Sequence, residues 1–192
     1  KINTYYKQLY MSNNGFYQMR VHRDVFESRK IERDSNIYFK VIDNNNRFHL
    51  RDSLSDLDFL CRSIKYKLPD WDGIPTIDKC LERLNTISSM MLFYHKDFNK
   101  AIGWSWNSDT YTENWVDTIN ELPHSDSNYL GGVYLQKNLN PPPNSGFQIY
   151  YQSFSYLLSK NQWLYGYADN WNRASKLNCH KLGVSESKFI KE

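Results

Sequence analysis

Residues 129–184 decide how this chain folds, and they read YLGGVYLQKNLNPPPNSGFQIYYQSFSYLLSKNQWLYGYADNWNRASKLNCHKLGV. Strand-forming residues fill positions 129–137, and apolar residues recur at helical spacing over 147–158. A second strand pattern covers 163–168, and a second helix starts near Asn172. Because a strand–helix–strand crossover joins parallel neighbours, this stretch predicts a sheet that contains a parallel pair and is covered by helices.

The turn before the first of these helices is a candidate anion site. Residues 141–143 are prolines, which stiffen the entry and lack amide donors. The amides of residues 144–148 open the helix and can point at a phosphate, with the helix dipole behind them. The alternative is a proline-rich loop that is capped by Ser145 and binds nothing. Upstream, Gly131-Gly132 interrupts the strand and predicts a bulge or the close approach of a ligand to the backbone.

The last helix carries a spacing motif. Residues 172–184, NRASKLNCHKLGV, resemble position for position the Asn-x-x-Ala-x-x-x-Tyr-x-x-x-Gly-Phe segment that closes the cofactor-binding half of GNAT-type N-acyltransferases. Asn172 takes the Asn place, Ser175 the small-residue place and Cys179 the Tyr place. Gly183-Val184 takes the Gly-Phe place, and Gly183 is also positioned to end the helix.

Two upstream segments extend this resemblance. Residues 133–136 are similar to the fourth strand of the family, and residues 144–148 fall where the family has its Arg-Gly-x-Gly-x-Gly/Ala pyrophosphate loop. Gly146 is retained. Pro143 stands in the place of Arg and Gln148 in the place of Gly or Ala, and a bulky Gln148 is expected to reshape the phosphate site.

The resemblance spans roughly residues 46–190 and implies an α/β fold of the GNAT type, a mixed central sheet with helices on both faces. Residues 43–46, DNNN, form a polar turn that indicates a boundary. The sequence therefore predicts an added N-terminal element in residues 1–45 and a GNAT-like acyltransferase domain in residues 46–192. A length of 192 residues and a hydrophobic fraction of 40% fit a folded domain with an added arm.

The segments before residue 129 predict further elements. Residues 47–51 alternate apolar and polar side chains, which is typical of a strand, and Ser53 can cap a helix that follows. Its apolar face is expected to hold Leu54, Leu57, Cys61, Ile64 and Leu68. Thr76 can cap a second helix, and the runs 90–95 and 101–106 predict a hairpin.

The resemblance implies an acyl-CoA-dependent N-acyltransferase, with acetyl as the expected acyl group. An amine acceptor, either a small molecule or a protein, would attack the thioester directly within a ternary complex. The residues expected to bind the cofactor lie on the fourth strand, the phosphate turn and the last helix: Leu135, Gln136, Lys137, Asn144, Ser145, Gly146, Phe147, Gln148, Asn172 and Ser175.

Cys179 and Tyr134 are the candidate catalytic residues. In the family, the Tyr at the place of Cys179 can protonate the leaving thiolate, and a thiol pKa of about 8.5 lies closer to neutrality than the value of about 10 for a phenol. A covalent acyl-Cys179 route lacks a base, because His180 points about 100° away around the helix. The structural alternative is a small buried apolar cysteine.

Residues 129–137 contain no acidic side chain, so a general base must come from elsewhere. One candidate is Tyr134 on the strand itself, the others lie just upstream, and the sequence does not choose among them: Glu113, Asp117, Glu121, His124 and Asp126. Residues 109–123 form a polar-aromatic insertion, either a substrate loop or a plain surface excursion. Nearby aromatic residues can line an acyl or acceptor pocket or belong to the core: Trp104, Trp106, Tyr111 and Trp115.

The composition excludes some classes of protein. A net charge of +3 and a pI near 8.6 are too small to imply nucleic-acid binding by themselves. Three widely spaced cysteines without a C-x-x-C pair indicate neither a disulfide framework nor a metal site. No apolar run is long enough to span a bilayer and no signal peptide opens the chain, so the sequence predicts a cytoplasmic protein.

Two other functions stay open at this stage. One is an enzyme of the same fold that modifies nucleic acid or uses a carrier-bound acyl chain, which the mild basicity and the aromatic residues permit. The other is a non-catalytic binding module that kept the fold, which the missing Tyr, Arg and second loop glycine permit.

Overall fold

The computed structural model describes residues 15–43, 47–67, 75–85, 88–108, 125–169 and 172–191. The strands are β1 Gly15–His22, β2 Ile37–Ile42, β3 Ser88–His95, β4 Ala101–Ser108, β5 Ser127–Leu135, β6 Trp163–Asp169 and β7 Ser185–Lys191. The helices are α2 Arg23–Glu27, α3 Arg47–Lys67, α4 Ile77–Leu84, α5 Ser145–Leu158 and α6 Arg173–Lys181, with a short 3₁₀ helix η1 at Lys137–Leu139.

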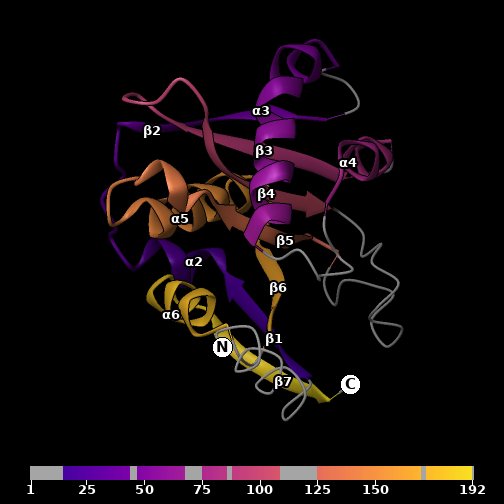
Figure 1. Ribbon diagram of the computed structural model, residues 1–192. Helices are drawn as coiled ribbons and strands as arrows, with labels where there is room; N and C mark the ends of the chain where they lie inside the picture. The colour runs from indigo at the N-terminus through magenta and orange to yellow at the C-terminus, as the bar shows by residue number, and fades with distance from the viewer. Residues whose placement is uncertain are drawn as a thin grey trace, which may run out of the picture.

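Within the described residues, one sheet of seven strands runs through the molecule in the order β2-β3-β4-β5-β6-β1-β7 (Figure 1). β5 and β6 pair in parallel, and the other neighbours pair antiparallel. The parallel pair is the one that α5 connects, as a crossover requires. The predicted mixed α/β sheet is confirmed.

Helices cover both faces of the sheet, and β3 shows how the sequence achieves this. Met90 and Leu92 pack with α3 and α4, whereas Met91 and Phe93 pack with α5 and α6. Successive strand residues point to opposite faces, so this apolar run fills two separate cores. Figure 1 shows α3 crossing in front of β3 and β4, with α4 to its right and α5 to the left of the strands.

The glycine pair in β5 forms the predicted bulge. Gly132 has φ +60, and the pairing of β4 with β5 shifts between Trp104 and Trp106. Leu130 packs on the α5 side, while Tyr134, four residues later, packs on the α3 side. Because residues an even number apart share a face in a regular strand, the bulge has turned Tyr134 to the opposite face.

The N-terminal stretch is built into the sheet. The sequence predicts an added element in residues 1–45, but β1 lies between β6 and β7, and β2 pairs with β3. The described part of the stretch therefore supplies two strands of the central sheet. No local pattern could predict this pairing, because the partners of β1 lie more than 140 residues further along the chain.

The strand predicted at residues 47–51 is wrong, because α3 already begins at Arg47. Ser53 is fully buried inside this helix and does not cap it. An alternating pattern of only five residues is weaker evidence for a strand than the longer helical spacing that follows is for a helix. Extending a helix by one turn also costs little free energy once the helix is nucleated. The apolar face is confirmed at Leu57, Cys61 and Ile64, whereas Leu54 is exposed and Leu68 lies outside the described residues.

The strand predicted over residues 129–137 ends at Leu135, because η1 begins at Lys137, but several other element predictions agree with the structure. Thr76 caps α4, β3 and β4 form the hairpin, and Asn172 caps α6 through its side chain. Gly183 follows α6 with φ +86, a conformation that favours glycine. Among the described residues, no helix is both long enough and apolar enough to cross a membrane.

Candidate functional site

The sheet opens between β5 and β6. Their parallel pairing runs from Ser127↔Trp163 to Leu130↔Gly166 and ends there. Beyond this point β5 continues along β4, and β6 continues along β1. One edge of β5 over residues 131–135 therefore faces the gap. The backbone N–H and C=O groups of this edge could form hydrogen bonds with a bound ligand.

The N-terminus of α5 lies at the end of β5 beside this opening. A Cβ built on Gly146 would meet Leu135 Cδ2 at 3.4 Å, so the first turn of the helix lies against the strand. Asn144 is the N-cap residue, but its side chain makes no capping hydrogen bond. The amides of Gly146 and Phe147 lie in the first turn, where amides have no acceptor within the helix. They are the donors that an anion would find here.

The Gln148 side chain does not face the candidate anion site at the first turn of α5. Its side-chain Oε1 accepts a hydrogen bond from the Asp34 amide at 3.0 Å, and its Nε2 donates to the Glu32 carbonyl at 3.0 Å. The side chain is buried and holds the segment that leads into β2. The expectation that Gln148 reshapes the phosphate site through its bulk is therefore wrong, because its side chain points to the other side of α5.

We expect Gln148→Leu to lower the free energy of unfolding by about 2–4 kcal/mol, because two backbone groups would lose their buried hydrogen-bond partner. Urea unfolding of the variant against the parent measures the effect. A loss below about 0.5 kcal/mol would mean that water replaces the amide and that Gln148 does not hold residues 32–34.

Asn172, Ser175 and Cys179 lie at the contact of α6 with α5. Asn172 Oδ1 accepts from the Ser175 amide at 3.1 Å, and Ser175 Oγ lies 2.7 Å from the hydroxyl of Tyr150 on α5. Burial raises the pKa of the Cys179 thiol to about 12, against a smaller opposing effect of its hydrogen bond with Ser175. Sequence reasoning missed Tyr150, whose partner becomes visible only once the helices pack.

Tyr134 lies on the opposite face. Its hydroxyl oxygen is buried and has no hydrogen-bond partner in the described part of the chain, and its ring lies 5.8 Å from that of Trp104. Tyr134 packs with the core beneath α3 and α4, whereas Cys179 belongs to the core beneath α5 and α6. The structure therefore does not bring the two predicted catalytic residues together.

More phenols line the same side of the sheet beyond the opening. Leu164 and Ala168 of β6 pack on the α5 side, so Tyr165 and Tyr167 point to the side of Tyr134. Their hydroxyl oxygens are buried, and the ring of Tyr167 lies 5.8 Å from that of Tyr129. Sequence reasoning missed these phenols on one side of the sheet. The pattern that could have predicted them is the alternation of Tyr165 and Tyr167 along one strand.

High pH is expected to destabilise the protein through these groups. Burial raises the pKa of Tyr134 and of Tyr167 to about 12, and it also raises the pKa of Tyr150 and Tyr165. In the unfolded chain phenols ionise near pH 10, so above that pH the unfolded state binds fewer protons than the folded state. The contribution of these protonated phenols to the free energy of unfolding is therefore fully present below about pH 10. It is lost as the pH rises toward 12.

Urea unfolding at about pH 8 and about pH 11, with tyrosinate absorbance as a second signal, tests this expectation. Tyr134→Phe should make the decline shallower. Titration of every tyrosine of the folded protein near pH 10 would contradict the burial of these hydroxyls.

The remaining residues that the sequence predicted for the site lie in several different environments. Gln136 is buried, and its Oε1 accepts from the Asn138 amide at 3.1 Å, which caps η1, while Lys137 is exposed. Asp126 is exposed. Trp104 and Trp106 are buried under α3 and α4, which favours the core reading. Six predicted residues lie outside the described part of the chain: Tyr111, Glu113, Trp115, Asp117, Glu121 and His124.

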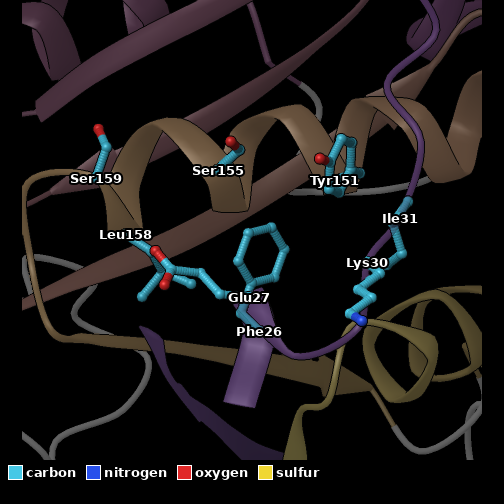
Figure 2. Close-up of a pocket in the computed structure, with 8 residues that line it drawn as sticks. All are labelled: Phe26, Glu27, Lys30, Ile31, Tyr151, Ser155, Leu158 and Ser159. Atoms are coloured by element: carbon cyan, nitrogen blue, oxygen red, sulfur yellow. The ribbon is translucent and has the colours of Figure 1, made fainter. Parts of the chain in front are cut away.

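A groove of about 290 Å³ lies elsewhere, between α2 and the outer side of α5 (Figure 2). Figure 2 shows Phe26 beneath α5, with Tyr151 and Leu158 on the helix above it. Its lining residues on α5 start at Tyr151, past the first turn that carries Gly146, so the groove is separate from the opening. Among the described residues, no group of three or more His, Cys, Asp or Glu could hold a metal ion.

Comparison with solved structures identifies the architecture. A GCN5-related N-acetyltransferase from Sphaerobacter thermophilus matches 97% of this chain with a TM-score of 0.59 and 10% identity, over 54% of its own length. An aminoglycoside acetyltransferase from an uncultured soil metagenomic sample, determined with trehalose, matches 84% of this chain with a TM-score of 0.56 and 11% identity, over 97% of its length. The chain has the GNAT fold.

A third structural neighbour is AAC(6')-Iy, determined with the bisubstrate analogue CoA-S-monomethyl-acetylneamine. It matches 82% of this chain with a TM-score of 0.54 and 15% identity, over 97% of its length. Other neighbours are longer, and the chain spans only 64% of a Staphylococcus epidermidis protein described as functionally unknown. No protein-family model and no curated protein matches the sequence.

Proposed function

We propose that this GNAT-fold protein is an N-acyltransferase that moves an acyl group, with acetyl expected, from acyl-coenzyme A to an amine. The observation that carries the proposal is the opening between β5 and β6, with the first turn of α5 beside it. A strand edge can bind the amide groups of a pantetheine arm, and helix amides can bind a pyrophosphate. The bisubstrate analogue held by AAC(6')-Iy supports a coenzyme A ligand.

We assign each group of residues a role in cofactor binding from its position in the fold. The backbone of residues 133–135 would align the pantetheine arm, and the amides of Gly146 and Phe147 would bind the pyrophosphate, with Lys137 as a nearby exposed cation. Asn172 and Ser175 would contribute indirectly, by holding α6 in place. They form the hydrogen bond that caps the N-terminus of α6.

Cys179 stays a candidate for the proton donor to the leaving thiolate, and we propose Tyr134 as the alternative donor. Burial keeps both groups protonated near neutral pH, with a pKa of about 12 for each. They lie on opposite faces of the sheet, so we propose that only one of them reaches the thioester. The buried hydroxyl of Tyr134, which lacks a partner in the described residues, favours Tyr134, whereas the packing of Cys179 fits a structural role.

Paired substitutions separate these two roles. We expect Tyr134→Phe to lower kcat by about 100-fold, because general acids contribute on that order, and Cys179→Ala to leave kcat within about 3-fold. The measurement is thiol release in a steady-state assay with acetyl-coenzyme A and an amine. The reverse pattern would assign the acid to Cys179, and two unchanged rates would remove both residues from the chemistry.

We propose a small-molecule amine as the acceptor, in line with the aminoglycoside acetyltransferases among the neighbours. The phenols of β5 and β6 on the α3 side would line the acceptor pocket. Nucleic acid fits less well, since the formal net charge is only +3.

The test is calorimetric titration of the protein with acetyl-coenzyme A and with coenzyme A, followed by an assay over a panel of amines. Saturable binding with turnover of an amine is the expected result. Binding without turnover across the panel would favour a non-catalytic module. Failure to bind either ligand would overturn the proposal.

A further inference from the structure

Cys61 of α3 and Cys80 of α4 form a close pair of thiols. Their Sγ atoms lie 4.0 Å apart, although the residues are 19 positions apart in the chain. Both are free cysteines in the core beneath α3 and α4, with exposed fractions of 6% for Cys61 and 1% for Cys80. Nothing in the proposed acyl transfer uses either thiol.

We propose that this pair is a redox modification site, at which a hydroperoxide converts the two thiols into a reversible disulfide that joins α3 to α4. A disulfide needs an S–S distance of about 2.05 Å. Each sulfur would have to move by about 1 Å, and rotation about the single side-chain torsion of each cysteine moves its sulfur without moving the backbone.

The surroundings make Cys61 the attacking thiol. The hydrogen bond between the two thiols lowers the pKa of Cys61 and raises that of Cys80. Burial and the nearby Asp58 act against ionisation of Cys61, and Arg83 favours ionisation of Cys80. Both thiols are buried, and Cys61 is slightly the more exposed of the two.

The reaction has two steps. The Cys61 thiolate attacks one oxygen of the hydroperoxide, the O–O bond breaks, and the leaving oxygen takes a proton to depart as water or an alcohol. Cys80 then attacks the sulfur of the resulting sulfenic acid, its thiol proton and the hydroxyl leave as water, and the S–S bond forms. The two thiols lose two electrons and the hydroperoxide gains them.

The position of the pair gives the bond two consequences. It would close a loop of the chain around residues 62–79, which restricts the unfolded state and raises the thermal midpoint. It would also fix α3 to α4 in the core that contains Trp104 and packs against Tyr134.

The test is titration of the full folded chain with hydrogen peroxide, followed by intact mass and by peptide mapping without reductant. We expect the loss of two hydrogens per chain, a peptide linking Cys61 to Cys80, a raised thermal midpoint, and reversal of all three changes by dithiothreitol. Cys179→Ser, which leaves the pair intact, should behave like the parent. Cys80→Ser should instead gain oxygen on Cys61 and form no link.

Oxidation confined to Cys179, a link that forms only after denaturation, or stepwise addition of oxygen to Cys61 in the parent chain would overturn the proposal. None of these measurements uses acyl transfer, so the result does not depend on the proposed enzyme activity.

Discussion

Replacing Gly146 by glutamate is expected to weaken coenzyme A binding by about 100-fold or more, which corresponds to about 2.7 kcal/mol. Gly146 lies in the first turn of α5, against Leu135 at the end of β5. A carboxylate placed there would occupy the amides proposed for the pyrophosphate and would repel its charge. Calorimetric titration with coenzyme A measures the loss.

The fold should survive this substitution. Gly146 has no positive φ, and glutamate is a better helix former than glycine, with its charge at the favourable end of the helix dipole. Gly146→Ala is the matched control, because its Cβ would meet only Leu135 Cδ2, at an ordinary contact distance of 3.4 Å. We expect the alanine variant to bind within about 3-fold of the parent and to be slightly more stable. Undiminished binding by the glutamate variant would place the cofactor elsewhere.

Gly103→Ala is expected to destabilise the protein by about 3 kcal/mol or more, the upper range for overpacking a core. Gly103 lies on β4 opposite Leu135, and a Cβ there would overlap the backbone oxygen of Tyr134 and approach Ile149 Cδ1 to 2.8 Å. Backbone cannot move aside as a side chain can, so β4 and β5 would have to separate at the end of β5 that borders the opening.

Urea unfolding of Gly103→Ala beside Gly146→Ala makes the comparison direct, since the same methyl group is added at two glycines. If Gly103→Ala does not fold, its absence from the soluble fraction beside a soluble Gly146→Ala gives the same answer. Equal stabilities of the two variants would show that β5 does not approach β4 as closely as described.

The elements that could be predicted from the sequence are those specified by neighbouring residues. The caps at Thr76 and Asn172 agree with the structure, as do the bulge at Gly131-Gly132 and the glycine after α6. Each depends on hydrogen bonds or backbone angles within a few residues, which a local pattern records. The crossover from β5 to β6 followed in the same way, because the handedness and length of such connections leave little choice.

The parts that could not be predicted depend on residues that are distant in the chain. Gln148 looked like a cofactor contact by position, but it bonds residues 32–34, more than 110 positions away. Residues 47–51 looked like a strand, but the helix that buries Leu57 extends back through them. A helix that is already nucleated extends by one more turn at little cost, and this outweighs an alternating pattern of only five residues.

For the described residues from 76 onward, the sequence by itself determined the order of the main helices and strands and the place of the turn before α5, because caps, glycines and hydrophobic spacing act over one or two turns of the chain. Only the tertiary structure decided that β1 completes the sheet between β6 and β7, that Tyr134 and Cys179 face opposite cores, and that Cys61 meets Cys80. These outcomes follow from sheet pairing and from the side on which each helix packs, and both depend on partners that no local segment contains.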